Sequence, residues 1–203
     1  MKKFFSVGDV DNLSQIVKEA LIEKASPNAN EALGKHKMMG LVFLNPSLRT
    51  RLSTQKAAMN LGMNVMVMNM DKDGWALETQ DGVVMNGTTV EHIREAAAVM
   101  GEYCDILGLR SFPSLKDREA DYNEDLFNKF IKFCGVPVVS LESATRHPLQ
   151  SINRSIDLRW CLHGLPMLKP FPRLFLIPLP NGWLKHRNRT CSISLSHTPP
   201  VMN

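Results

Sequence analysis

Two clusters of polar side chains, about a hundred residues apart, could together bind an anion and polarise a carbonyl group. The first cluster combines hydroxyl and guanidinium groups in the run Ser47-Leu48-Arg49-Thr50-Arg51. The second places an imidazole and a carboxamide around a proline in the run His147-Pro148-Leu149-Gln150. Guanidinium groups bind phosphate through two parallel hydrogen bonds, so a ligand with both a phosphate and a carbonyl group could use both clusters.

The chemistry of the first cluster depends on its place at the start of a helix. Backbone N–H groups at a helix N-terminus favour an anion, and Arg49 can bind a phosphate through a two-pronged contact that lysine cannot make. The alternative is an ordinary helix cap, formed by Ser47, with solvated arginines. The position of the cluster directly after an apolar run favours the anion site.

The chemistry of the second cluster is hydrogen bonding to a carbonyl group. His147 can donate to a carbonyl oxygen that becomes negative in a tetrahedral transition state, and the amide oxygen of Gln150 can hold an NH2 group. Arg110 would add a second donor to the same oxygen. The alternatives are a loop histidine with ordinary partners and, for Arg110, a surface ion pair with Asp105 or Glu102.

The elements that must position these residues follow from the hydrophobic pattern. Unbroken apolar runs, typical of strands covered on both faces, predict strands at 38–44, 64–70, 105–109 and 136–140. Helical spacing predicts helices at 11–25, 48–61 and 124–133, with Gly62 and Gly135 at the ends of the last two. A fourth helix would open at a capping box formed by Thr88 and Glu91 and run to about Met100.

The alternation of helices and strands predicts an α/β fold. Crossovers of helix length indicate a doubly wound, four-stranded parallel sheet with helices on both faces. Ligands of such sheets bind outside the carboxyl ends of the strands. Residues 47–51 follow the first strand, Arg110 follows the third and residues 142–150 follow the fourth, so we expect them to converge on one edge.

Charge and composition divide the chain into two parts. Residues 1–151 carry 17 basic and 19 acidic residues, whereas residues 152–203 carry 7 basic residues, one acidic residue and seven of the twelve prolines. We therefore predict one domain at 1–151 and an irregular, basic, proline-rich tail at 152–203. The tail is either a native linker or, the interpretation that we favour, a frame-shifted or truncated remnant of a second domain.

Several classes of protein are disfavoured by the sequence. The four cysteines form no C-x-x-C pair, so we expect free thiols and no metal site. The N-terminus lacks the apolar run of a signal peptide, and no segment reaches the roughly 20 apolar residues of a membrane span. We expect a cytoplasmic protein that binds neither membranes nor nucleic acid.

The two polar clusters also resemble the signatures of a known family. The runs Phe43-Leu44-Asn45-Pro46-Ser47-Leu48-Arg49-Thr50-Arg51 and His147-Pro148-Leu149-Gln150 look like those of the aspartate/ornithine carbamoyltransferases, over residues 1–151. The resemblance implies that residues 47–50 bind the phosphate of carbamoyl phosphate. It also implies that Thr50, Arg110 and His147 polarise the carbamoyl oxygen and that Gln150 holds the carbamoyl amine, within a binding run that includes Pro148 and Leu149. Direct attack by an amine is implied, with no covalent enzyme intermediate, metal or cofactor.

Two further segments resemble the N-acylornithine branch of this family. They are Asp73-Gly74-Trp75-Ala76-Leu77-Glu78 and Glu142-Ser143-Ala144-Thr145-Arg146. The resemblance implies that Trp75 reaches the site of a neighbouring subunit in a homotrimer, and that Glu142 contacts the N-acylated ornithine. The resemblance also implies that Val90 lies in the region that faces the acyl group. A short, uncharged residue there leaves room for a longer acyl group, which favours N-succinylornithine over N-acetylornithine.

The chain departs from this family after the first domain. The Cys-Leu-Pro motif of the family's second domain is missing, and Trp160-Cys161-Leu162-His163 lacks the proline and comes too early. We therefore expect a carbamoyltransferase of arginine biosynthesis whose turnover is impaired in this chain. The alternatives are a non-catalytic carbamoyl phosphate-binding remnant and an interaction protein that acts through its basic tail.

Overall fold

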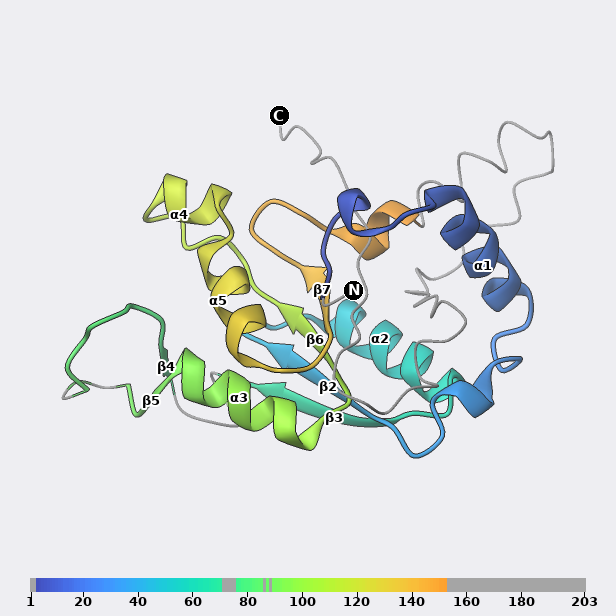
Figure 1. Cartoon of the computed structure of the whole chain (residues 1–203), viewed down its shortest axis with the longest axis horizontal. Helices are drawn as coiled ribbons and strands as arrows, with labels where there is room; N and C mark the ends of the chain where they lie inside the picture. Colours follow the sequence, from blue (N-terminus) through green and yellow to red (C-terminus); the bar gives the residue numbers. More distant parts are fainter. Residues whose placement is uncertain (1–2, 71–75, 86, 88, 153–203) are drawn as a thin grey trace.

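The core of the protein is a parallel β-sheet with the strand order β1-β7-β6-β2-β3 (Figure 1). The structure is a computed structural model that describes residues 3–70, 76–85, 87 and 89–152. All four predicted strands are present, and all the pairings in this sheet are parallel. The five strands are β1 (Lys3–Phe4), β2 (Met38–Phe43), β3 (Asn64–Asn69), β6 (Ile106–Arg110) and β7 (Val138–Glu142).

The predicted number of strands was one too few. The additional strand, β1, pairs with β7 at the edge of the sheet through Lys3 and Phe4. Two residues are too short to produce a hydrophobic period. The sheet therefore has five strands, and the α/β fold class is confirmed.

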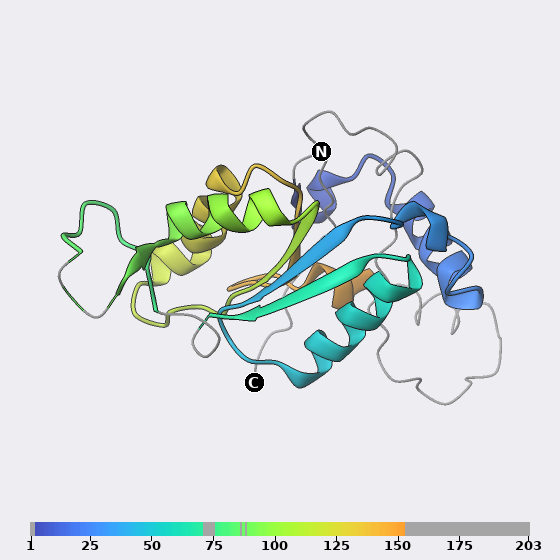
Figure 2. The ribbon, with the colours of Figure 1, turned by 90° about the horizontal axis from the view of Figure 1, so that it is seen from below.

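Helices cover both faces of the sheet, as predicted (Figure 2). One buried cluster joins Leu41 to apolar residues of α1, α2 and the helical residues 148–152. A second cluster joins the next residue, Val42, to α3 and α5, because alternate residues of a strand face opposite sides of the sheet. The helices are α1 (Leu13–Ala25), α2 (Leu48–Asn60), α3 (Ile93–Tyr103), α4 (Arg118–Tyr122) and α5 (Asp125–Phe133).

The predicted start of α3 was wrong. Thr88 lies outside the described residues, and Glu91 belongs to a short strand, β5 (Glu91–His92), which pairs with β4 (Leu77–Glu78). The capping box is formed four residues later: Nδ1 of His92 accepts from the Arg94 N–H at 3.2 Å, and the Glu95 carboxylate accepts from the His92 N–H at 3.4 Å. Pairing with β4 keeps residues 91–92 extended, so the helix begins after them.

Gly62 reverses the chain after α2, as predicted. Its φ is +76°, and a Cβ at this position would collide with the carbonyl oxygen of Glu31. A left-handed conformation costs a non-glycine residue about 1–2 kcal/mol, and the collision adds to this cost. We therefore expect Gly62→Ala to lower the free energy of unfolding, measured with urea, by about 2 kcal/mol or more.

Gly82 provides a matched control for this substitution. Its φ is +79°, and no described atom lies within 4 Å of the position that a Cβ would take. Gly82→Ala should therefore show the conformational cost alone. Equal losses of stability in the two variants would contradict the close approach between Gly62 and Glu31.

Candidate functional site

The predicted site residues lie at the carboxyl edge of three neighbouring strands. In the sheet order, β6 stands between β7 and β2, so the segments that follow these strands leave the same edge side by side. From β2 the chain continues to β3 on one side and later returns to β6 on the other. The gap between β2 and β6 is therefore the topological switch point, where ligands of doubly wound sheets bind.

Ser47 forms the N-cap of α2 at this edge. Its Oγ accepts from the Thr50 N–H at 3.3 Å and donates to the Thr50 Oγ1 at 2.9 Å. Thr50 is buried, whereas Leu48 and Arg49 are exposed. The cap fixes the direction of the first helical turn, whose backbone N–H groups point outward without partners inside the helix. An anion can therefore approach these N–H groups and the Arg49 guanidinium together.

Arg110 ends β6 and is buried, with 5% of its surface exposed. Its Nε and Nη2 donate to the Glu142 Oε2 at 3.1 and 2.8 Å, and its Nη1 donates to the carbonyl oxygens of Asn45 and Pro46 at 2.9 and 3.0 Å. Arg110 forms its ion pair with Glu142 and not with Asp105 or Glu102, and Asp105 instead pairs with Lys37, with Nζ and Oδ1 2.9 Å apart. A guanidinium has five N–H donors, so one Nη2 hydrogen has no partner among the described residues.

Asn45 and Phe112, for which the sequence predicted no role, connect the segments that follow β2 and β6. The Oδ1 of Asn45 accepts from the Phe112 N–H at 2.6 Å, and the Phe112 ring lies 4.1 Å from the Arg110 guanidinium carbon. Asn45 thus holds the segments after β2 and β6 together through both its side chain and its carbonyl group. The available signal was an Asn-Pro pair at a strand end, where an asparagine side chain often bonds to backbone.

His147 precedes a helical turn that begins at Pro148. Its Nδ1 accepts from the Gln150 N–H at 3.4 Å, and its carbonyl oxygen accepts from the Ser151 Oγ at 3.0 Å. Because Nδ1 accepts, the neutral imidazole carries its proton on Nε2, which makes Nε2–H a donor. The side chain of Leu149 packs in the core, so this residue can offer a ligand its backbone only.

Of the three residues that the family resemblance relates to the N-acylated ornithine, the structure describes two, Glu142 and Val90. Glu142 lies at the end of β7 and shares the Arg110 ion pair. Val90 is 66% exposed, close before β5. Trp75 lies outside the described residues. The structure therefore brings Glu142 to the same edge as Ser47 and Arg110.

A cavity of about 550 Å³ lies beside this edge, between the loop after β6 and the helices α4 and α5. Ser111 and Phe112 line it, next to Arg110, and side chains of both charges, including Lys129 and Asp121, line the rest. Hydrogen bonds from the Ser114 and Leu115 N–H groups lower the pKa of the Asp121 carboxyl, since they favour its charged form. The cavity contains none of the predicted site residues.

The described residues offer neither a metal site nor a reactive thiol. No group of three or more His, Cys, Asp or Glu side chains could hold a metal ion there. Cys104 and Cys134 are free and buried, and burial raises the pKa of the Cys104 thiol to about 11, which leaves little reactive thiolate at neutral pH. Within the described part of the chain, no helix is long and apolar enough to cross a membrane.

Fold and site together define a doubly wound α/β domain with a candidate anion site at its switch point. The family model described as "Aspartate/ornithine carbamoyltransferase, carbamoyl-P binding domain" matches residues 2–158. The chain therefore belongs to the aspartate/ornithine carbamoyltransferase family, and the matched residues are its carbamoyl-phosphate-binding domain.

Relatives in the N-acylornithine branch are more similar than an ornithine enzyme. The chain is 45% identical to N-succinylornithine carbamoyltransferase of Bacteroides thetaiotaomicron, over 86% of this chain and 59% of the relative. It is 39% identical to N-acetylornithine carbamoyltransferase of Xanthomonas campestris, over 70% and 42%. Identity to an ornithine carbamoyltransferase of Listeria monocytogenes is 28%, over 70% and 38%. The resemblance to the N-acylornithine branch is confirmed, and the chain spans 59% or less of these relatives.

Solved structures agree with this assignment. A mutant of N-acetyl-L-ornithine transcarbamylase, complexed with carbamyl phosphate and N-succinyl-L-norvaline, has a TM-score of 0.74 and 35% identity, over 83% of this chain and 50% of that one. Acetylornithine transcarbamylase complexed with acetylcitrulline has a TM-score of 0.72 and 34% identity, with the same coverage. The described domain therefore has the same fold as half of each of these enzyme structures.

Proposed function

We propose that this chain binds carbamoyl phosphate at the carboxyl edge of β2, β6 and β7. It would act in an enzyme that transfers the carbamoyl group to the δ-amine of an N-acylated ornithine, in arginine biosynthesis in the cytoplasm. One observation carries the proposal. The buried Arg110 bonds the carbonyl groups of Asn45 and Pro46, directly before the Ser47 cap. A donor suited to a carbonyl oxygen is thereby fixed beside a helix N-terminus suited to a phosphate.

The phosphate would bind at the start of α2. The backbone N–H groups of the first turn are neutral donors, the Ser47 hydroxyl becomes one when it turns from the Thr50 Oγ1 to the phosphate, and Arg49 supplies charge and a two-pronged contact. Leu48 would contribute its backbone, as its exposed side chain has no polar group. Capping by Ser47 holds these donors in one orientation before the ligand arrives.

The carbamoyl group would lie against the donors of the neighbouring segments. Thr50, the remaining Nη2 hydrogen of Arg110 and Nε2–H of His147 would donate to its oxygen, and the Gln150 amide oxygen would accept from its NH2 group. The lone pair of the δ-amine forms the new C–N bond while the C=O electrons move to oxygen, where the donors stabilise the negative charge. The electrons then return, the C–O bond to phosphate breaks, and the amine proton passes to the departing phosphate, which is a base at the same site.

N-Succinylornithine is the acceptor that we favour over N-acetylornithine. Glu142 donates no hydrogen bond as a carboxylate, and its Oε1 could accept from the N–H of the acylated α-amine while Oε2 holds Arg110. Val90 offers a longer acyl group space and no negative charge. The higher identity to an N-succinylornithine enzyme supports the same choice. Trp75 of a neighbouring subunit would complete the site in a homotrimer.

The second candidate function is carbamoyl phosphate binding without catalysis by this 203-residue chain alone. The chain spans 59% or less of the length of its N-acylornithine relatives, and transfer needs both substrates held in one geometry, so binding without transfer is a second outcome to test for these 203 residues alone. We propose that residues 152–203 do not supply the second half of the site, whether they are a frame-shifted remnant or a linker.

A transfer assay separates the two candidates. The purified chain is incubated with carbamoyl phosphate and, in parallel, with N-succinylornithine, N-acetylornithine or ornithine, and the carbamoylated product is measured by mass spectrometry. Turnover on N-succinylornithine would establish the transferase in this chain. Binding of carbamoyl phosphate in calorimetry without product would establish the second candidate, and neither binding nor product would contradict both.

A further inference from the structure

We propose that Glu124 is a positioning residue for the carbamoyl end of the site, an inference that rests on the proposed function. Glu124 lies between α4 and α5, on the face of the sheet opposite α2. Its carboxylate holds residues 143–145, which lead directly to His147 and Gln150. In Figure 1 this loop runs beside the upper end of α5.

The carboxylate of Glu124 accepts four hydrogen bonds from the loop. Its Oε1 accepts from the Ser143 Oγ at 2.8 Å, from the Thr145 N–H at 2.8 Å and from the Thr145 Oγ1 at 2.6 Å. Its Oε2 accepts from the Ala144 N–H at 3.2 Å. Glu124 is 5% exposed and Ser143 is 4% exposed, so these bonds are made largely out of water. A carboxylate accepting several N–H and O–H bonds away from water fixes its partners strongly.

The backbone of Glu124 is held in a conformation that its side chain does not favour. Its φ and ψ are 56° and 39°, the left-handed region, which non-glycine residues rarely adopt. Such conformations persist where the surroundings hold them, and they gather at functional sites. Helix α5 begins at the following residue, Asp125, so the left-handed residue lies at the turn into that helix.

Packing on an aromatic ring holds the other end of the same loop, at Arg146. The Arg146 guanidinium carbon lies 4.6 Å from the centre of the Phe5 ring, and Phe5 stacks on Phe127 with the ring centres 4.7 Å apart. Phe127 is on α5, one turn after Glu124. The loop is therefore fixed at residues 143–145 by hydrogen bonds to Glu124 and at Arg146 by packing on Phe5.

Two hydrogen bonds between Ser143 and Arg146 close a turn directly before His147. The Ser143 N–H donates to the Arg146 carbonyl oxygen at 2.8 Å, and the Arg146 N–H donates to the Ser143 Oγ at 3.2 Å. Ser143 is thus bonded to Glu124 on one side and to both backbone groups of Arg146 on the other. The next residue is His147, so a shift of Ser143 displaces the imidazole and the helical turn that carries Gln150.

The substitution Glu124→Gln tests this role with little change of shape. The amide oxygen can replace one carboxylate oxygen, but the NH2 group faces a donor of the loop instead of accepting from it. Binding of carbamoyl phosphate and of inorganic phosphate is measured by calorimetry on the full 203-residue chain. Carbamoyl phosphate binding should weaken by about tenfold or more, since small displacements at a site cost on the order of 10²-fold. Inorganic phosphate, which uses residues 47–50, should bind within about twofold of wild type.

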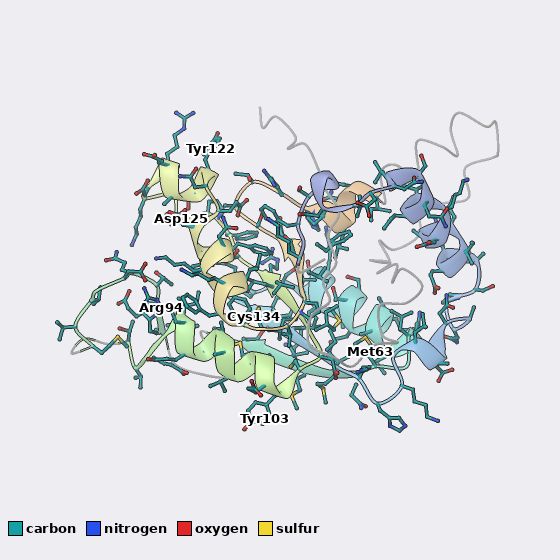
Figure 3. The ribbon with its side chains drawn as sticks, in the orientation of Figure 1. Met63, Arg94, Tyr103, Tyr122, Asp125 and Cys134 are labelled. Carbon is teal, nitrogen blue, oxygen red and sulfur yellow. The ribbon has the colours of Figure 1, made fainter. Side chains whose placement is uncertain are left out.

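Two further variants complete this experiment. Asp125→Asn removes a negative charge at the exposed neighbouring position, labelled in Figure 3, and should change neither affinity. Thr145→Val removes the 2.6 Å bond from the loop side and should reproduce the selective loss. If Glu124→Gln does not fold, Thr145→Val alone tests whether these hydrogen bonds position the carbamoyl end of the site.

Three outcomes can be told apart. A selective loss of carbamoyl phosphate binding supports the positioning role of Glu124. Equal losses for both ligands, or no loss for either, would overturn it while wild-type binding upholds the proposed function. A wild-type chain that binds carbamoyl phosphate no better than inorganic phosphate would contradict the proposed function itself, and the inference with it.

Discussion

Replacing Arg110 with alanine should abolish carbamoyl phosphate binding and destabilise the fold. The guanidinium makes four hydrogen bonds, two of them to Glu142, and is almost fully buried. Its removal leaves the Glu142 carboxylate and the carbonyl groups of Asn45 and Pro46 without these donors. Breaking a buried pair costs about 3–5 kcal/mol. Because the Glu142 side chain is 29% exposed, we expect a loss of about 2–3 kcal/mol in urea unfolding.

The variant Arg110→Lys separates the effect of Arg110 on stability from its effect on binding. Lysine keeps the positive charge but cannot bond Glu142 and two carbonyl oxygens while keeping a further N–H for a ligand. The fold should recover part of its stability, whereas calorimetry should still show carbamoyl phosphate binding weakened by about tenfold or more. Full binding by either variant would exclude Arg110 from the carbamoyl site.

Replacing Arg49 with alanine should strongly weaken the binding of phosphate and carbamoyl phosphate without destabilising the protein. Arg49 is exposed in the first turn of α2, so its truncation leaves no buried group unpaired, and unfolding should change by less than about 0.5 kcal/mol. A charge-assisted hydrogen bond is worth about 1.5–3 kcal/mol. Loss of a two-pronged contact should therefore weaken both ligands by about 100-fold in calorimetry.

Arg51 offers a matched control for Arg49. It is exposed on the same helix and carries the same charge, but two residues further along it faces away from Arg49. Arg51→Ala should therefore lower the affinity for inorganic phosphate only slightly, through the loss of one distant charge. If both variants lost affinity equally, the effect would be one of net charge and the specific contact of Arg49 would be refuted.

Local pattern was enough to predict the framework of this domain. Buried parallel strands are continuous apolar runs, so the four longer strands stood out, and their order along the chain placed residues 47–51, Arg110 and residues 142–150 at one edge. The N-cap role of Ser47 was also available, because a serine before a helical run is a local signal. The structure confirms both features.

The features that were missed depend on contacts between distant residues. The strand β1 exists only through its pairing with β7, and α3 begins after His92 because residues 91–92 pair with β4. The alternative considered for Arg110 was an ion pair with Asp105 or Glu102, which are near in sequence, but its partner is Glu142, the last residue of the neighbouring strand β7. Glu124 belongs to no sequence motif, because its hydrogen-bond partners lie in a loop about twenty residues away.

The central claim is that carbamoyl phosphate binds where β2, β6 and β7 end, and a crystal structure of the chain soaked with carbamoyl phosphate tests it most directly. We expect the phosphate at the first turn of α2, against Ser47 and Arg49, and the carbamoyl oxygen within about 3 Å of Arg110 and His147. Carbamoyl phosphate bound instead in the cavity beside α4 and α5, or density for it nowhere on this edge, would contradict the account.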